Sequence, residues 1–215
     1  MALTPEQIAA HLAQRNPFAT RSVRPGVMKF RFYDGNSLPQ MLDKLRQNGW
    51  TGEIVGRHGS GKSTLLHSLI PLLIEAGRDV KIFTMHRGES RLPVSGTDMQ
   101  KWSETTQVLI DGYEQLGGWT RTLVTRVCRK EGCGLLVTSH EPVGLPTLYQ
   151  TDPNLAIVQS LVREMQHRHN GQARVFDTDV AHSYERQRGN IREVFFELYD
   201  VYEQRRDVTG NDASS

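Results

Sequence analysis

Nine consecutive residues, GRHGSGKST, have the types and the spacing that bind phosphate groups. The pattern G-x-x-x-x-G-K-[ST] is filled by Gly56, Gly61, Lys62 and Ser63. Glycines let the backbone turn tightly, so that successive N–H groups point at phosphate oxygens, while the lysine reaches the β- and γ-phosphates. The sequence therefore predicts a nucleotide on the following residues, of which His58 only lines the loop: Gly56, Arg57, His58, Gly59, Ser60, Gly61, Lys62, Ser63 and Thr64.

Two oxygen-bearing side chains are candidates for holding the Mg²⁺ that accompanies a nucleotide. The hydroxyl of Ser63 directly follows the lysine, as the phosphate-loop pattern requires. Asp111 ends the apolar run 108–110, which reads as a buried strand. We expect Ser63 and Asp111 to be the metal ligands; the alternative is that Asp111 is an ordinary residue at a strand end.

Hydrolysis also needs a group that orients or activates water. Gly112 directly follows Asp111, and the nearest carboxylate beyond it is Glu114, which can curl back if the strand ends at Asp111. The next apolar run ends in Thr138 and His140, where a hydroxyl or an imidazole would sense phosphate or position water. We expect Glu114 and His140 to be the catalytic candidates; the alternatives are a solvated loop glutamate and a structural histidine.

The elements that must position these residues alternate between strand and helix. Apolar runs predict strands at residues 51–56, 79–88, 107–116, 134–142 and 145–152, the third running into a polar loop. Helical spacing and end signals predict helices at residues 37–50, 62–77 and 120–132. This alternation predicts an α/β fold, a three-layer α/β/α core with a mainly parallel sheet.

The chain is expected to consist of four parts. Residues 1–34 form an N-terminal arm with a strand at 27–33, and residues 35–152 form the core. Residues 153–206 contain three amphipathic helical segments, which predict a small helical lid. Residues 207–215 are polar and are expected to be a flexible tail.

Composition narrows the class of protein. The 215 residues are 37% hydrophobic, without an apolar run long enough to span a membrane and without a signal-like start, so a cytoplasmic location is expected. Cys128 and Cys133 are too few and wrongly spaced for a metal knuckle or a redox pair, which favours buried reduced thiols. The formal net charge of +2 indicates no strong footprint for nucleic acid.

These motifs together resemble a known family. GRHGSGKST, VLIDGYE and LLVTSH resemble Walker A, Walker B and sensor 1 of the additional-strand P-loop NTPases, and GNIREV resembles the sensor-2 region of AAA+ ATPases. Over about residues 35–206 the chain is similar to small bacterial AAA-type ATP-binding proteins. The resemblance implies ATP and Mg²⁺ as cofactors and an Arg192 that reaches the γ-phosphate from the lid.

The sequence departs from this family at one important position. Gly112 stands where the Walker-B glutamate usually follows the aspartate, and no clear arginine finger is present. Arg121, Arg126 and Arg129, on the helix after Walker B, are only candidates for that role.

The expected function is a Mg-dependent ATPase that couples its nucleotide state to a partner protein, to further copies of itself or to nucleic acid. A small-molecule kinase is an alternative, although a C-terminal helical part disfavours it. A non-hydrolysing switch or scaffold is a second alternative, suggested by Gly112.

Overall fold

The computed structural model describes residues 16–168 and 173–211 of the chain. The first part of the predicted arm and the last four residues of the predicted tail therefore lie outside the described residues. The chain divides into two compact units, one formed by residues 29–152 and the other by residues 1–28 together with residues 153–215. Each unit is described by itself below.

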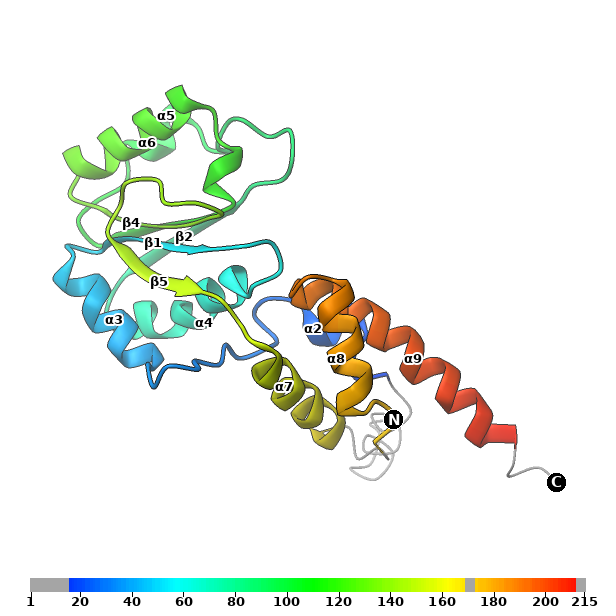
Figure 1. The fold of residues 1–215 in the computed structure, drawn as a ribbon. Helices are drawn as coiled ribbons and strands as arrows, with labels where there is room; N and C mark the ends of the chain where they lie inside the picture. Colours follow the sequence, from blue (N-terminus) through cyan, green and yellow to red (C-terminus); the bar gives the residue numbers. More distant parts are fainter. Residues whose placement is uncertain (1–15, 169–172, 212–215) are drawn as a thin grey trace, which may run out of the picture. The chain divides into compact units, whose positions relative to one another are not determined.

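The larger unit is built on a parallel sheet (Figure 1). Its strands are β1 (Thr51–Gly56), β2 (Asp79–Thr84), β3 (Thr106–Asp111), β4 (Gly134–Ser139) and β5 (Thr147–Thr151). They lie in the order β2-β3-β4-β1-β5, and every neighbouring pair is parallel. The predicted α/β fold with a mainly parallel sheet is confirmed, and β4 separates the phosphate-loop strand from the strand that ends in Asp111.

Burial along the strands follows their position in the sheet. The central strands β3 and β4 are buried along almost their whole length, as apolar runs in a parallel sheet require. By contrast, β2 has only Val80 and Phe83 half-buried, and its other residues are exposed. The apolar run at residues 79–88 predicts a second buried strand, and this prediction is wrong because β2 lies at the edge of the sheet, next to β3.

Helices cover both faces of the sheet (Figure 1). One face packs against α3 (Leu38–Gln47) and α4 (Lys62–Glu75), which contains Pro71. The other face packs beneath α5 (Gly96–Met99) and α6 (Gly118–Lys130), and a short 3-10 turn, η1 (Tyr113–Gln115), connects β3 to α6. Cys128 and Cys133 are free and buried in this second layer, as expected.

The segment that precedes α3 is not the predicted strand. Within residues 27–33 the structure has only an isolated bridge, between Pro25 and Met28. The rings of Phe30, Phe32 and Tyr33 instead contact Tyr149 of β5, with centroids 5.2–6.1 Å away in edge-to-face geometry. The alternation of the sequence therefore reflects aromatic packing against the sheet rather than pairing with it.

The smaller unit is helical. Its elements are α2 (Thr20–Val23), α7 (Leu155–Arg168), α8 (Asp177–Arg186) and α9 (Ile191–Asn211). Phe18, Val158, Val162, Val194 and Leu198 form the centre of its core, in agreement with the helical spacing of the sequence. Because α9 runs to Asn211, the first part of the segment expected to be a flexible tail is helical.

Asn16 and Phe18, at the start of the described chain, belong to the core of this helical unit. Asn16 donates from its amide to the carbonyl of Tyr199 and to Glu203 on α9, while its side-chain oxygen accepts from the backbone of Phe18.

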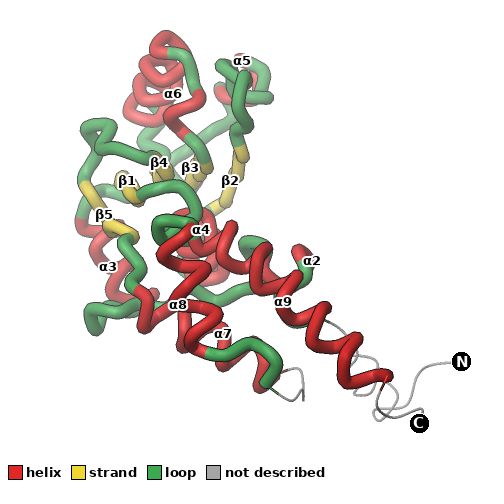
Figure 2. The backbone as a smooth tube through the Cα atoms, turned by 45° about the vertical axis from the view of Figure 1, so that its right-hand side comes forward, coloured by secondary structure: helices red, strands yellow, loops and turns green. Residues whose placement is uncertain are grey.

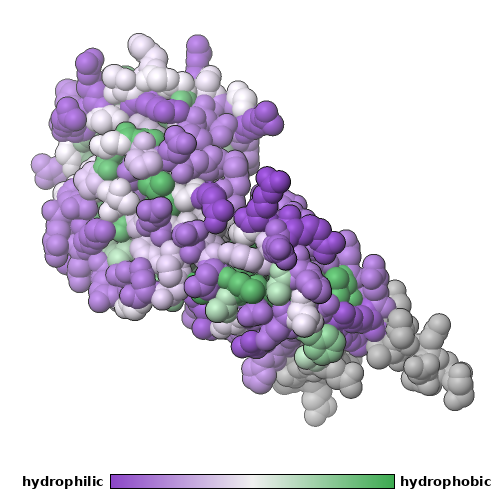
Figure 3. All heavy atoms as spheres, viewed as in Figure 1, coloured by the Kyte–Doolittle hydropathy of each residue, from purple (hydrophilic) through white to green (hydrophobic). Residues whose placement is uncertain are grey.

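Hydrophilic residues dominate the face drawn in Figure 3, and hydrophobic ones are scattered in small groups. No helix within the described ranges, α9 included, combines the length and apolar character needed to cross a membrane.

Candidate functional site

The phosphate-binding loop connects β1 to α4, the context that its pattern requires. Gly59 and Gly61 have φ angles of +68° and +96°, in the left-handed region that favours glycine. Gly61 is followed at once by the first turn of α4, whose N–H groups have no partners within the helix. This end of the helix carries a partial positive charge, and the backbone is therefore arranged to receive an anion.

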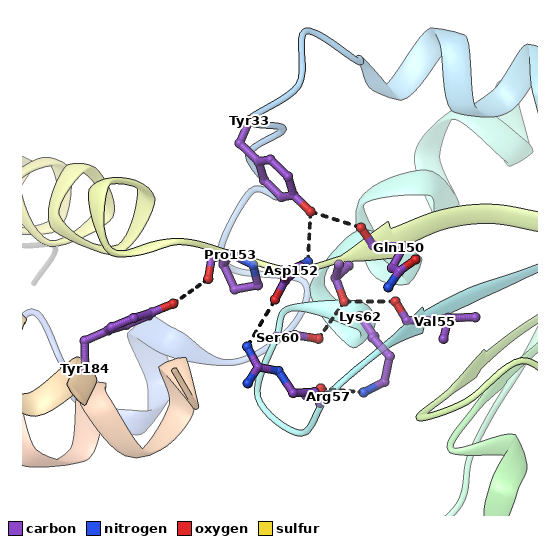
Figure 4. A network of polar contacts seen from close by, with 10 residues as sticks. Tyr33, Val55, Arg57, Ser60, Lys62, Gln150, Asp152, Pro153 and Tyr184 are labelled. Atoms are coloured by element: carbon purple, nitrogen blue, oxygen red, sulfur yellow. Dashed lines mark hydrogen bonds and ion pairs between the residues drawn. The ribbon is translucent and has the colours of Figure 1, made fainter. Parts of the chain in front are cut away.

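The lysine of the loop is buried. Lys62 is 8% exposed, and its ammonium group donates to the carbonyl oxygens of Gly56 (2.6 Å) and Arg57 (2.8 Å) (Figure 4). Burial lowers the pKa of Lys62, while the negative charges of Glu114 and Asp111 oppose that shift. A cation held mainly by neutral carbonyl groups in a partly desolvated position is well placed to bind an anionic group.

Three elements bring hydroxyl and carboxylate oxygens together beside this lysine. Asp111, at the end of β3, accepts at Oδ1 from Ser63 on α4 (3.0 Å) and from Thr138 on β4 (2.6 Å). Thr138 in turn accepts from the backbone N–H of Gly112 at 2.9 Å, which fixes its orientation. The sequence predicted Ser63 and Asp111 as metal ligands, and it gave the strand end with Thr138 a role in sensing phosphate or positioning water rather than in holding Asp111.

These oxygens fit Mg²⁺, which prefers hard oxygen ligands and is usually held by one or two carboxylates together with phosphates and waters. The described residues contain no group of three or more His, Cys, Asp or Glu that would enclose a metal ion by themselves.

The second carboxylate reaches the site through a turn. Gly112 has a φ of +84°, and a Cβ added to it would lie 2.9 Å from the carbonyl oxygen of Met85, so a glutamate at this position would be strained. The chain turns there into η1, which carries Glu114. Its Oε1 lies 3.2 Å from Nε2 of His140, and its Oε2 is buried without a hydrogen-bond partner among the described residues. Gly112 therefore displaces the carboxylate by two positions rather than removing it.

Two histidines meet at the same place. The ring of His58 lies 3.7 Å from that of His140, centroid to centroid, so His58 contacts a catalytic candidate as well as lining the loop. Burial lowers the pKa of His140, and the neighbouring Lys62 and His58 add to that effect, while Glu114 and Glu141 oppose it. This shift favours the neutral form of the imidazole.

The loop is also tied to β5, which sequence reasoning missed. The hydroxyls of Ser60 and Thr151 lie 2.5 Å apart, and a Cβ on Gly56 would lie 2.1 Å from that of Thr151. Arg57 forms an ion pair of 3.1 Å with Asp152, as Figure 4 shows. Only the pairing of β1 with β5 reveals these contacts, because the residues are more than ninety positions apart in the chain.

Two candidate arginines, Arg121 and Arg192, make contacts with the chain itself. Arg121 donates to the carbonyl oxygens of Leu116 (2.8 Å) and Glu114 (2.6 Å), so it supports η1 and is not available as an arginine finger. Arg192 belongs to the helical unit, where its guanidinium lies 5.8 Å from the ring centroid of Phe196. Its predicted role toward the γ-phosphate stays a prediction.

The sequence matches no family model and no curated protein. The fold, by contrast, is similar to those of solved structures. Domain III of the replication initiation protein DnaA from Thermotoga maritima aligns with a TM-score of 0.53 and 18% identity over 79% of this chain and 83% of that chain.

A second similar structure is S. cerevisiae Hsp104 in its complex with casein, with a TM-score of 0.50 and 11% identity over 82% of this chain and 38% of that chain. C. elegans PCH-2 aligns over 94% of this chain and 68% of that chain with 13% identity, but its TM-score is only 0.37. The first two likenesses support the three-layer α/β/α fold with a parallel sheet.

Proposed function

We propose that the chain binds ATP with Mg²⁺ on residues 56–64 and hydrolyses it, as an ATPase of the AAA type. One observation carries this proposal: Ser63, Asp111 and Thr138 share hydrogen bonds at the tips of three elements, beside the buried ammonium of Lys62. The position of β4 between β1 and β3 supports the additional-strand class of P-loop NTPases.

Each group has a role that follows from its chemistry. The N–H groups of the loop and Lys62 bind the phosphates, and Ser63 and Asp111 hold Mg²⁺, which when bound neutralises charge on the phosphate oxygens. Thr138 keeps the carboxylate of Asp111 oriented through its 2.6 Å hydrogen bond. A fixed carboxylate loses less conformational freedom when the metal arrives.

Glu114 is proposed to accept a proton from the attacking water. Its buried Oε2 has no partner, and an unpartnered carboxylate oxygen is available to a water molecule. Its Oε1 contacts the imidazole of His140, which positions the carboxylate. Arg192 is proposed to report the γ-phosphate to the helical unit, so that nucleotide state is passed to a partner protein or to further copies of the chain.

A non-hydrolysing nucleotide switch is the second candidate. The observation in its favour is Gly112, because the turn excludes a carboxylate at the position next to Asp111. The two candidates make the same prediction for binding and opposite predictions for turnover.

The test is binding and turnover of MgATP by the parent and by Lys62→Ala, with Lys101→Ala as the matched control at an exposed position. We expect Lys62→Ala to lose binding at least about 10-fold because the phosphates lose their cation, and the control to bind like the parent. Thermal stabilisation by MgATP and phosphate release are the two readouts.

If Lys62→Ala were stabilised by MgATP as strongly as the parent, the loop would not be the nucleotide site. If the parent bound MgATP tightly but released no phosphate, the switch would replace the ATPase.

A further inference from the structure

The outer face of α6 carries an unusual combination of side chains. Trp119, in its first turn, is 80% exposed. The exposed positions Trp119, Thr122, Arg126 and Arg129 follow at intervals of three and four residues, so they form one stripe along the helix. An exposed tryptophan therefore stands at one end of a row that continues with arginines.

The charge of α6 is positive only. Its sequence GWTRTLVTRVCRK contains four basic residues and no acidic residue. Arg121 is turned to the backbone of η1, and Lys130 pairs with Glu131 at 2.8 Å. Arg126 and Arg129, in contrast, have no hydrogen bond or ion pair with any described residue, so their charges are available to a partner.

A second basic segment lies against the start of this helix. The carbonyl oxygen of Ser90, in the loop 85–95 between β2 and α5, accepts from the backbone of Gly117 (3.0 Å) and from the hydroxyl of Thr120 (3.0 Å). These bonds hold Ser90 against the start of α6, and α5 and α6 lie on the same face of the sheet (Figure 2).

The same loop carries positive charge of its own. Arg87 and Arg91 are exposed, and neither side chain has a partner in the part of the chain that the structure describes. The acidic residue between them, Glu89, is turned back onto its own loop, where it accepts from the backbone N–H of His86 at 2.6 Å. The five residues Arg87, Arg91, Trp119, Arg126 and Arg129 are called the basic aromatic face below.

We propose that the basic aromatic face binds single-stranded nucleic acid. Proteins that bind single strands combine positive charges along the phosphate backbone with aromatic rings on which bases stack. Arginines supply bidentate donors for phosphate, and an exposed indole supplies the stacking surface. A duplex hides the faces of its bases, so the tryptophan favours the single-stranded form. The net charge of +2 conceals this surface because acidic residues elsewhere balance it.

The test is fluorescence anisotropy with a fluorescein-labelled oligo(dT) of about 20 nucleotides, titrated with the full chain. We expect binding that weakens as salt rises from about 50 to 200 mM, because counterions are released from the phosphates. Trp119→Ala is expected to weaken binding about 10-fold, and Trp119→Phe to retain most of it, because stacking persists.

The arginines give a separate readout. The double variant Arg126→Gln/Arg129→Gln is expected to reduce the slope of log K against log salt by about 1.4, since each lost phosphate contact removes about 0.7. Arg46→Gln, on α3 at the opposite face of the sheet, is the matched control and is expected to bind like the parent. Thermal melting of every variant confirms that the fold is intact.

Three outcomes would overturn the proposal. In the first, the parent does not bind oligo(dT) at low salt. In the second, Trp119→Ala and Arg126→Gln/Arg129→Gln both bind oligo(dT) like the parent, which places the nucleic acid on another surface. In the third, polyglutamate binds as tightly as oligo(dT) and Trp119→Ala has no effect, which indicates an acidic protein partner. Nucleotide turnover does not enter this measurement, so its result is independent of the proposed ATPase.

Discussion

Polar groups are used differently at the tips of the strands and in the helical unit. In the helical unit, the buried amide of Gln166 makes three hydrogen bonds, to the backbone of Arg174 and Val175. Asp179 and Arg205 are joined there by two bonds, of 2.6 and 2.9 Å. At the strand tips, Glu114 keeps a buried oxygen without a partner.

This difference distinguishes polar groups that stabilise the fold from polar groups that remain available to bind a ligand. A buried polar atom without a partner costs stability, so its presence needs a reason other than stability. At the strand tips the same place also has a buried lysine and a histidine whose pKa is lowered mainly by burial. Perturbed ionisable groups gathered in one place are typical of functional sites.

The largest expected effect concerns the unpartnered carboxylate. Glu114→Gln is expected to bind MgATP like the parent and to turn it over at least about 100-fold more slowly, because general-base assistance is lost. Single-turnover phosphate release measures the rate. Glu104→Gln, at an exposed glutamate that precedes β3, is the control and is expected to keep the parental rate. Unchanged turnover in Glu114→Gln would show that this oxygen has no catalytic use.

A smaller effect, on stability rather than turnover, is expected in the helical unit. Gln166→Leu is expected to lower the free energy of unfolding by about 2 kcal/mol, because it leaves buried backbone groups of Arg174 and Val175 unpaired. MgATP turnover is expected to stay within about twofold of the parent. Urea denaturation measures the change.

The control for this variant is Gln159→Leu, on the same helix, whose side chain makes one hydrogen bond of 3.3 Å at an exposed position. It is expected to change stability by less than about 0.5 kcal/mol. A loss of turnover in Gln166→Leu without a loss of stability would contradict the contrast between the two regions.

The smallest effect concerns pH. The pKa of His140 lies below its ordinary value of 6.5, so folding favours the neutral imidazole. The resulting stability is fully present above pH 6.5 and is lost as pH falls below it, toward the folded pKa. His140→Gln is therefore expected to lose less stability than the parent between pH 7 and pH 5. Thermal melting of both proteins across this range measures the difference. If the two melting temperatures fell in parallel with pH, protonation of His140 would not contribute to the pH dependence of stability.

Much of the site could be predicted because its signals are local. The glycines and lysine of residues 56–64 are consecutive, and their strand and helix flank them directly. Asp111 could be placed because a buried run of three apolar residues precedes it. Helical spacing likewise predicted α7, α8 and α9, since each buries one stripe of its own surface.

The predictions that were wrong concern segments whose structure depends on their place in the whole fold rather than on their own sequence pattern. The segment 27–33 alternates like a strand, yet its aromatic rings contact Tyr149, which is more than a hundred residues away. The run 79–84 is apolar enough to be central, yet it lies at the edge of the sheet. Strand order depends on all strands together and has no counterpart in a single segment.

The sequence by itself determined the phosphate loop, the parallel α/β class and the chemical types of the candidate residues, because each depends on neighbours within a few positions. Only the tertiary structure decided which groups meet. It placed Thr151 against Gly56, turned Glu114 toward His140 through Gly112, and fixed Ser90 against the start of α6. The physical reason is that contacts between distant segments are made by the packing of the whole sheet and its helices, which no local spacing encodes.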